Sequence, residues 1–237
     1  MSDNDLLVIV PTRGRRAQCE RLLESFDRTV TCADLVFVTD PDDGSYEGMD
    51  WGGAECAVLE PRQMLSGKLN KTAMSFAGAY PVLMWCADDH VFRTPGWDKL
   101  MLQALEDMGG SGWVWPDSRR RSDVPEIWMC SSDVVQALGW FANPALSHYY
   151  LDNSIADLGK RSGLYRWCPE AVIEHLHYSV CPETERDVVY RETEGTHGEK
   201  DMAAYREWHA SVLPMQVAQL RRKFNPDVLW LLEKVGA

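Results

Sequence analysis

The sequence predicts an α/β fold in which a mixed, mostly parallel sheet is flanked by helices and followed by a helical C-terminal extension. Short apolar runs of strand length, such as residues 6–10 and 82–87, alternate with segments whose apolar residues recur at helical spacing. Turn-forming and charged residues follow these runs directly, as at residues 11–15 and 40–45. This alternation favours a sheet covered by helices on both faces, with right-handed crossover connections.

Each element is expected from a local pattern of apolar residues and turn signals. The strands expected in order are residues 6–10, 35–39, 54–59, 82–87, 113–117 and 127–130, with edge strands at 164–167 and 171–173. The first helix presents Cys19, Leu22, Leu23 and Phe26 on one face, and further helices are expected around residues 69–77, 97–108, 132–138, 154–159, 202–212 and 226–232. The highly charged residues 183–199 are expected to form a mobile loop or lid.

Composition limits the classes of partner. The 237 residues carry a net charge of −12, which disfavours general attraction to nucleic acid or to an anionic membrane. Seven scattered cysteines without a C-x-x-C pair indicate reduced thiols. The apolar run at residues 6–10 is too short for a signal peptide or a membrane span, so we expect a cytoplasmic protein without membrane insertion.

The segment around which the chain is organised is the strand of residues 82–87 and the polar triplet that follows it. Asp88, Asp89 and His90 are three consecutive potential metal ligands. Ligands bind outside the carboxyl ends of strands in open α/β sheets, so this position favours a metal-assisted site. The alternative is a solvated acidic turn, and the other strand ends could likewise be independent polar turns. The charged residues that the same edge would gather are Arg13, Arg15, Asp40 and Asp42.

A second group of potential ligands follows late in the chain. His175 and His177 are two positions apart, so in an extended segment both point to one side. Either histidine could instead be an ordinary core or surface residue. With the carboxylates, the pair suggests a divalent cation that holds a diphosphate: Mn²⁺ or Mg²⁺ if carboxylates dominate the ligand set, and Zn²⁺ if histidines do.

Several motifs together resemble a known family, and no dinucleotide-binding or P-loop glycine motif competes with them. They are residues 8–15, Asp40 with residues 42–45, Asp88-Asp89-His90, Asp152, and residues 174–177. In this order they resemble the GT-A fold, nucleotide-sugar-dependent glycosyltransferases of the family 2-like group, and small phage-encoded members in particular. The resemblance covers about residues 6–180. It implies a Rossmann-like GT-A domain over residues 1–180, with a nucleotide-binding half to residue 110, an acceptor-side half from 111, and a mobile loop with C-terminal helices from 181.

The resemblance also implies roles for individual residues. The donor, expected to be a UDP-sugar, would be bound by Pro11, Thr12, Arg13, Arg15, Asp40, Lys68, Asn70 and Asp88. Asp88 and His90 would bracket the metal in a D-x-H version of the family's DXD motif, with Asp89 as a further possible ligand. His177, or else His175, would complete the coordination sphere of Mn²⁺ or Mg²⁺.

Asp152 is the expected catalytic base for deprotonating an acceptor hydroxyl, provided that the reaction inverts the anomeric centre. Its alternative role is that of a helix N-cap. The acceptor itself stays open between a modified DNA base, a protein and a glycan, and the run Arg119-Arg120-Arg121 is either a solvated loop or a phosphate contact. The expected function is glycosyl transfer, in the host cytoplasm if the chain is phage-encoded. The alternatives are a nucleotidyltransferase acting on a sugar phosphate and a non-catalytic nucleotide-sugar-binding protein.

Overall fold

The computed structural model describes residues 5–181 and 188–226, and its centre is one eight-stranded mixed sheet. The strand order is β3-β2-β1-β4-β7-β6-β8-β5. Parallel pairing joins β1 to β2 and β4, β2 to β3, and β6 to β8, whereas β7 runs antiparallel to β4 and β6, and β5 to β8. The strands are β1 (Leu6–Pro11), β2 (Ala33–Thr39), β3 (Glu55–Val58), β4 (Val82–Trp85), β5 (His90–Phe92), β6 (Trp113–Asp117), β7 (Trp128–Ser131) and β8 (Tyr165–His175). This is the mixed, mostly parallel sheet that the sequence predicts.

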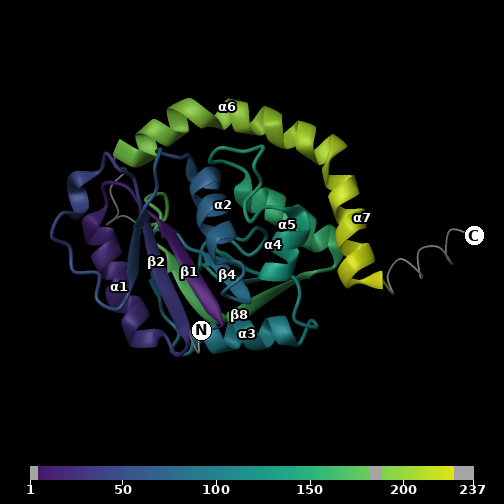
Figure 1. Ribbon diagram of the computed structural model, residues 1–237, viewed down its shortest axis with the longest axis horizontal. Coiled ribbons are helices and arrows are strands. Elements are labelled where there is room, and N and C mark those ends of the chain that lie inside the picture. The colour runs from purple at the N-terminus through teal and green to yellow at the C-terminus, as the bar shows by residue number, and fades with distance from the viewer. Residues whose placement is uncertain (1–4, 182–187, 227–237) are drawn as a thin grey trace, which may run out of the picture.

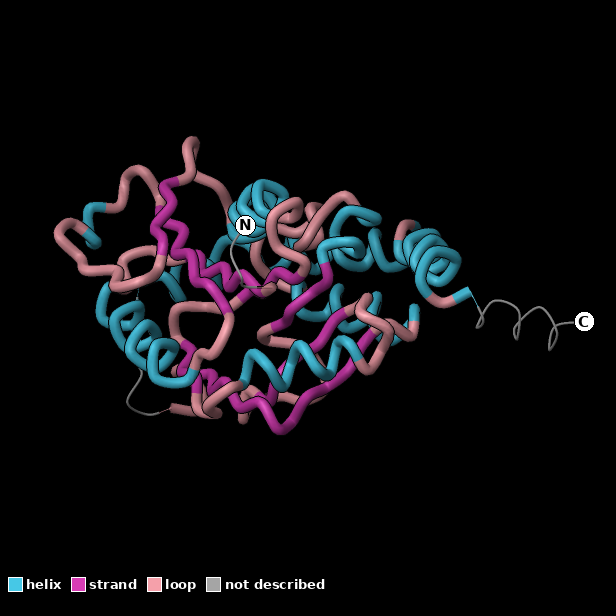
Figure 2. Tube along the Cα trace, turned by 60° about the horizontal axis from the view of Figure 1, so that its bottom comes forward, coloured by secondary structure: helices cyan, strands magenta, loops and turns pink. Residues whose placement is uncertain are grey.

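Helices cover both faces of the sheet (Figure 1). Helices α1 and α3 pack on one face and α2, α4, α5 and α7 on the other, together with the end of α6. In Figure 2 the strands run through the middle of the molecule between these helices. The helices are α1 (Arg16–Thr29), the 3₁₀ helix η1 (Gly44–Tyr46), α2 (Leu65–Phe76), α3 (Trp97–Glu106), α4 (Ser132–Leu138), α5 (Leu151–Ser162), α6 (Val188–Ser211) and α7 (Leu213–Phe224).

Strand β1 shows why the core forms on two sides of the sheet. All six of its residues are buried, and successive side chains point to opposite faces. Leu6 and Val8 pack in the α1–α3 layer, whereas Leu7 and Ile9 pack in the α2–α5 layer. Fully burying an aliphatic side chain contributes about 1.5–3 kcal/mol. The continuous apolar run is therefore the pattern of a strand covered on both faces.

The second half of the chain corrects two sequence-based expectations. The segments 164–167 and 171–173 are parts of one strand, β8, which lies inside the sheet between β6 and β5 rather than at an edge. Residues 188–199 are not a loop, because they form the first half of α6. The expected lid residues 183–187 and the expected last helix beyond residue 226 lie outside the described residues.

Helix α6 crosses the top of the molecule in Figure 1 and joins α7 at Val212. Pro214 lies in the first turn of α7, where its missing N–H is tolerated, and it accounts for the break between the two helices that the sequence predicts. Among the described residues, no helix combines the length and the apolar character that a membrane span requires.

Candidate active site

Two cavities lie at the edge of the sheet where β1, β2 and β4 deliver their carboxyl ends. The smaller has a volume of 160 Å³ and the larger of 740 Å³, a size typical of ligand sites. Five residues line both cavities and so form a shared wall: Arg15, Leu65, Trp85, Ala87 and His148. The shared wall makes the two cavities adjoining parts of one site.

The smaller cavity contains a buried carboxylate beside two cations. Asp40 follows β2 directly and is only 3% exposed. Its carboxylate lies 2.9 Å from Nζ of Lys68, which α2 supplies, and 3.1 Å from a guanidinium nitrogen of Arg13, from the loop after β1. Pro11 and Thr12 line the same cavity. The structure thus brings together most of the residues that the sequence assigned to the donor.

Asn70 is the exception among these residues, because it lines neither cavity. Its side-chain amide donates to the carbonyl of Ala142 at 2.7 Å and accepts from the N–H groups of Phe141 and Ala142. Asn70 therefore holds the 141–142 backbone against α2, which is a structural role.

Asp88 closes the floor of the smaller cavity. The Thr12 hydroxyl donates to one of its oxygens at 2.7 Å, and Arg15 donates to the other at 2.9 Å. Burial raises the pKa of Asp88, and Arg15 and Thr12 offset only part of this rise. These contacts hold Asp88 at the smaller cavity, and Asp88 is not part of the cluster of possible metal ligands found among the described residues.

Asp89, His90 and His175 form a cluster of possible metal ligands whose donor atoms lie within 4.8 Å of one another. The pairing of β5 with β8 places His90 directly opposite His175, and their rings stack with centroids 4.3 Å apart. One oxygen of Asp89 lies 3.3 Å from His90 Nδ1 and 3.4 Å from His175 Nε2. Strand register therefore assembles the cluster from residues that are far apart in the sequence.

The protonation states of this cluster suit a metal ion. Burial alone would raise the pKa of Asp89, but the two adjacent imidazoles outweigh burial and hold it well below its usual range. Burial lowers the pKa of His90, as does the nearby His175, so His90 is neutral at physiological pH. His90 Nε2 is buried and makes no hydrogen bond with any described residue. An ionised carboxylate beside a neutral imidazole provides donors that suit Mn²⁺ or Zn²⁺.

The cluster found in the described residues differs from the D-x-H interpretation. It contains Asp89 rather than Asp88, and His175 rather than His177. His177 lines the larger cavity, and its Nδ1 lies 2.7 Å from the Ser179 hydroxyl. Of the two late histidines, it is His175 that the pairing of β5 with β8 sets opposite His90.

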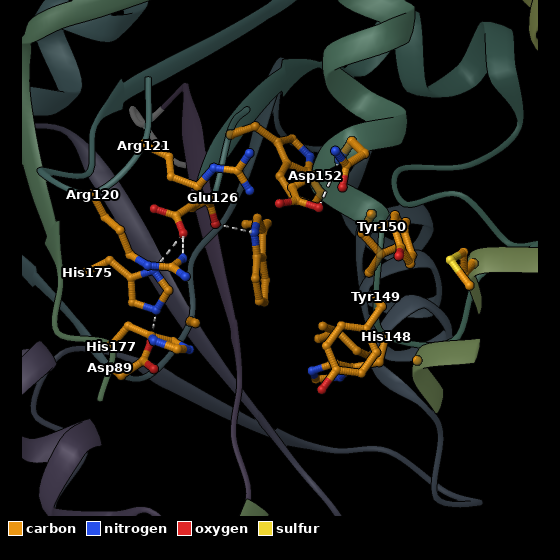
Figure 3. A pocket seen from close by; sticks show the side chains of 18 of the residues that line it. Asp89, Arg120, Arg121, Glu126, His148, Tyr149, Tyr150, Asp152, His175 and His177 are labelled. Carbon is orange, nitrogen blue, oxygen red and sulfur yellow. Dashed lines mark hydrogen bonds and ion pairs between the residues drawn. The ribbon is translucent and has the colours of Figure 1, made fainter. Parts of the chain in front are cut away.

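The larger cavity has two walls, which Figure 3 shows facing each other. One wall carries Asp89, His175, Glu126 and the arginines 120 and 121. The other carries Asp152 and the segment 148–150. The metal-ligand cluster and the predicted base therefore face one space.

Asp152 lies in the first turn of α5, where Tyr150 occupies the N-cap position. Asp152 is thus not the cap of this helix, although one of its oxygens accepts the N–H of Asn153 at 2.9 Å. Burial raises the pKa of the Asp152 carboxyl. A carboxylate with a raised pKa beside a cavity is a better proton acceptor than an exposed one.

Sequence reasoning missed several residues of the site. His148 lies on the shared wall, and burial lowers its pKa to about 4. Glu126, together with Gly198, Glu199 and Met202 of α6, lines the larger cavity. These residues come from loops and from a helix whose place no local pattern reveals. The run of arginines 119–121 shortly before Glu126 was the one available signal.

Asp201 fixes α6 above the cavity. Its carboxylate accepts three consecutive backbone N–H groups, those of Ser147, His148 and Tyr149, at 2.8–2.9 Å. Burial alone would raise the pKa of Asp201, but these donors outweigh it and hold the pKa below its ordinary value. The bonds tie the helix to the cavity wall.

Comparison with known proteins supports the fold. No protein-family model and no curated protein matches the sequence. The mannosyltransferase from Pyrobaculum calidifontis, solved with GDP-Man and Mn²⁺, matches with a TM-score of 0.54 and 13% identity, over 92% of this chain and 73% of that one. Glucosyl-3-phosphoglycerate synthase from Mycobacterium tuberculosis, solved with Mn²⁺, UDP and phosphoglyceric acid, matches with a TM-score of 0.61 and 12% identity, over 86% and 78%. The chain has a GT-A-like fold.

At these identities the likeness is one of fold. Both of these proteins were solved with Mn²⁺ and a nucleotide or nucleotide sugar. The roles of individual residues in this GT-A-like chain depend on its own site.

Proposed function

We propose that the protein is a metal-dependent glycosyltransferase that moves a sugar from a nucleoside-diphosphate sugar to a hydroxyl acceptor. The observation that carries the proposal is the position of the Asp89–His90–His175 cluster beside two adjoining cavities, one lined by Asp40 and one by Asp152. A donor that spans the shared wall would place its nucleotide in the smaller cavity and its sugar in the larger.

The smaller cavity would bind the nucleotide. Asp40 can accept hydrogen bonds from a base or ribose, and Lys68 and Arg13 keep its charge compensated. Arg15 and His148 lie on the shared wall, where the diphosphate of such a donor would pass. A UDP-sugar is the proposed donor, in keeping with the UDP bound to the mycobacterial synthase.

Asp89 and His175, with His90 beside them, would hold the ion. Mn²⁺ is the proposed metal because mixed carboxylate and imidazole sites accept it, and Mn²⁺ is also present in the solved glycosyltransferases. When bound, the ion supplies Lewis-acid stabilisation of the negative charge that develops on the departing diphosphate. Asp89 is already ionised at neutral pH, so it requires no proton loss on binding.

Asp152 would act as the base. It faces the larger cavity, where an acceptor hydroxyl would approach the sugar, and its raised pKa favours proton transfer near neutral pH. Removal of the hydroxyl proton by Asp152 belongs to an inverting reaction. The acceptor, whether a modified DNA base, a protein or a glycan, would enter between Asp152 and the arginines 120 and 121.

The test is a donor panel. The purified protein is incubated with UDP-, GDP- and other nucleotide sugars with Mn²⁺, and free nucleoside diphosphate is measured with and without chelator. We expect slow, Mn²⁺-dependent release from one donor, which Asp89→Asn abolishes and the surface change Asp107→Asn leaves unchanged. Pyrophosphate formation from a sugar phosphate and a nucleoside triphosphate would instead identify a nucleotidyltransferase. Binding of the donor without turnover, with every candidate acceptor supplied, would contradict catalysis.

A further inference from the structure

His175 connects the metal-ligand cluster to further charged residues on the other side of its ring. His175 Nε2 lies 3.4 Å from Asp89, and its other ring nitrogen, Nδ1, lies 3.3 Å from Oε1 of Glu126. The same Glu126 oxygen pairs with the guanidinium of Arg120. Figure 3 shows Glu126 on the far side of the His175 ring from Asp89. The imidazole therefore lies between two carboxylates.

Glu126 is held in place from several sides. Its side chain is only 5% exposed, and the Ser118 hydroxyl donates to Oε2 at 2.7 Å. Its backbone carbonyl accepts the indole N–H of Trp85 at 3.0 Å. Burying a carboxylate costs free energy unless the carboxylate is paired with hydrogen-bond donors or cations. These contacts therefore hold the Glu126 side chain in one position.

Ser118 connects Glu126 to the backbone of His175. The Ser118 carbonyl accepts the backbone N–H of His175 at 3.1 Å, while the Ser118 hydroxyl holds the Glu126 carboxylate. Ser118 thus fixes the position of the Glu126 carboxylate relative to the strand that carries His175. Nδ1 of His175 is buried and makes no hydrogen bond with another described residue, so Glu126 is the group placed to accept one from an Nδ1–H.

We propose that Glu126 is a positioning residue that holds His175 as the Nδ1–H tautomer and leaves Nε2 to face Asp89 and the metal ion. This inference rests on the proposed metal site. A carboxylate behind a metal-binding histidine fixes the ring orientation and raises the basicity of the ligand nitrogen. Arg120 pairs with the same Glu126 oxygen that faces His175, so the ion pair helps to hold this oxygen against the imidazole.

The first test measures Mn²⁺ affinity in the folded, nucleotide-free protein by electron paramagnetic resonance titration. Glu126→Gln keeps the shape of the side chain but removes its charge, and we expect a Kd about 10- to 100-fold weaker. Ser118→Ala leaves the carboxylate in place but loosens it, so we expect a smaller weakening. Asp107→Asn removes a surface carboxylate that pairs with Arg166 at 3.0 Å, and it should leave the Kd unchanged.

The second test needs no metal and no variant. Nitrogen-15 NMR of the imidazole distinguishes the two neutral tautomers, and above the titration range His175 should carry its proton on Nδ1. A predominant Nε2–H tautomer, or equal Mn²⁺ affinity in the wild type and Glu126→Gln, would overturn the inference and leave the transferase proposal intact. Absence of Mn²⁺ binding by the wild type would overturn both. Near-ultraviolet circular dichroism checks that each variant is folded.

Discussion

Replacing Asp201 by asparagine should loosen the attachment of α6 to the cavity wall at a calculable cost. The carboxylate accepts three backbone N–H groups, and the amide of asparagine can keep two of them on its oxygen. A hydrogen bond to a charged group contributes about 1.5–3 kcal/mol and a neutral one about 0.5–1.5, so each retained bond loses about 1 kcal/mol. The N–H left without an acceptor costs about 2 kcal/mol more. We therefore expect Asp201→Asn to lower the free energy of unfolding by about 4 kcal/mol.

The pH dependence of this loss provides an internal check. Because the folded-state pKa of Asp201 lies below its ordinary value of 3.8, its contribution is fully present above that value and is lost as the pH falls through the folded-state pKa. Denaturant unfolding of wild type and variant should therefore differ most at about pH 7 and converge in strong acid. A loss below about 1 kcal/mol at neutral pH, or an equal loss at both extremes, would refute the account.

Asp98 supplies a matched control for Asp201. It accepts the backbone N–H groups of residues 31–33 at 2.6–3.1 Å and is fully buried, but it lines neither cavity. All three bonds are to one oxygen, which the amide of asparagine can keep, so Asp98→Asn should cost about 3 kcal/mol. Only Asp201→Asn should raise hydrogen exchange at the amides of residues 147–149 and weaken ligand binding in the larger cavity.

Three further changes test the site. Asp152→Asn should lower turnover about 10²- to 10⁴-fold, while the melting temperature holds or rises because a carboxyl whose pKa burial has raised is replaced by a neutral group. Arg15→Met leaves the Asp88 carboxylate buried without its cation, and urea unfolding at neutral pH should show a loss of about 3–5 kcal/mol. That loss should shrink in acid, because the raised pKa of Asp88 lets it take up a proton. Lys68→Met removes the 2.9 Å partner of Asp40, and calorimetry should show weaker nucleotide binding together with a stability loss of about 3–5 kcal/mol; unchanged affinity would argue against a nucleotide in the smaller cavity.

The elements that the sequence predicts best are those with continuous buried runs. Strand β1 and helix α1 follow directly from their apolar patterns, and the turns after β1, β2 and β4 correctly mark the edge where the site forms. Strand β8 was harder to place because many of its residues are exposed although it lies between two strands. The first half of α6 lacks an apolar face, so no periodicity indicated a helix there.

The residues of the candidate site that follow strand ends could be predicted from the sequence. The residues that tertiary packing brings to the site could not. Asp89 and His175 could be proposed from strand ends and spacing, but the choice between Asp88 and Asp89 depends on where β5 begins. Glu126 and His148 reach the site from loops, through contacts with residues distant in the sequence. Contacts of that kind leave no local pattern.

At the proposed metal site, the register of β5 against β8 makes Mn²⁺ affinity a reporter of whether β8 has joined the sheet. His90 and His175 meet only once the strand that ends at His175 has joined the sheet, and a slip of one residue would send the histidine to the opposite face. A nascent chain that stops short of His175 cannot assemble the cluster. Mn²⁺ added during refolding should therefore be captured only after β8 has docked, and should then stabilise the folded sheet by mass action.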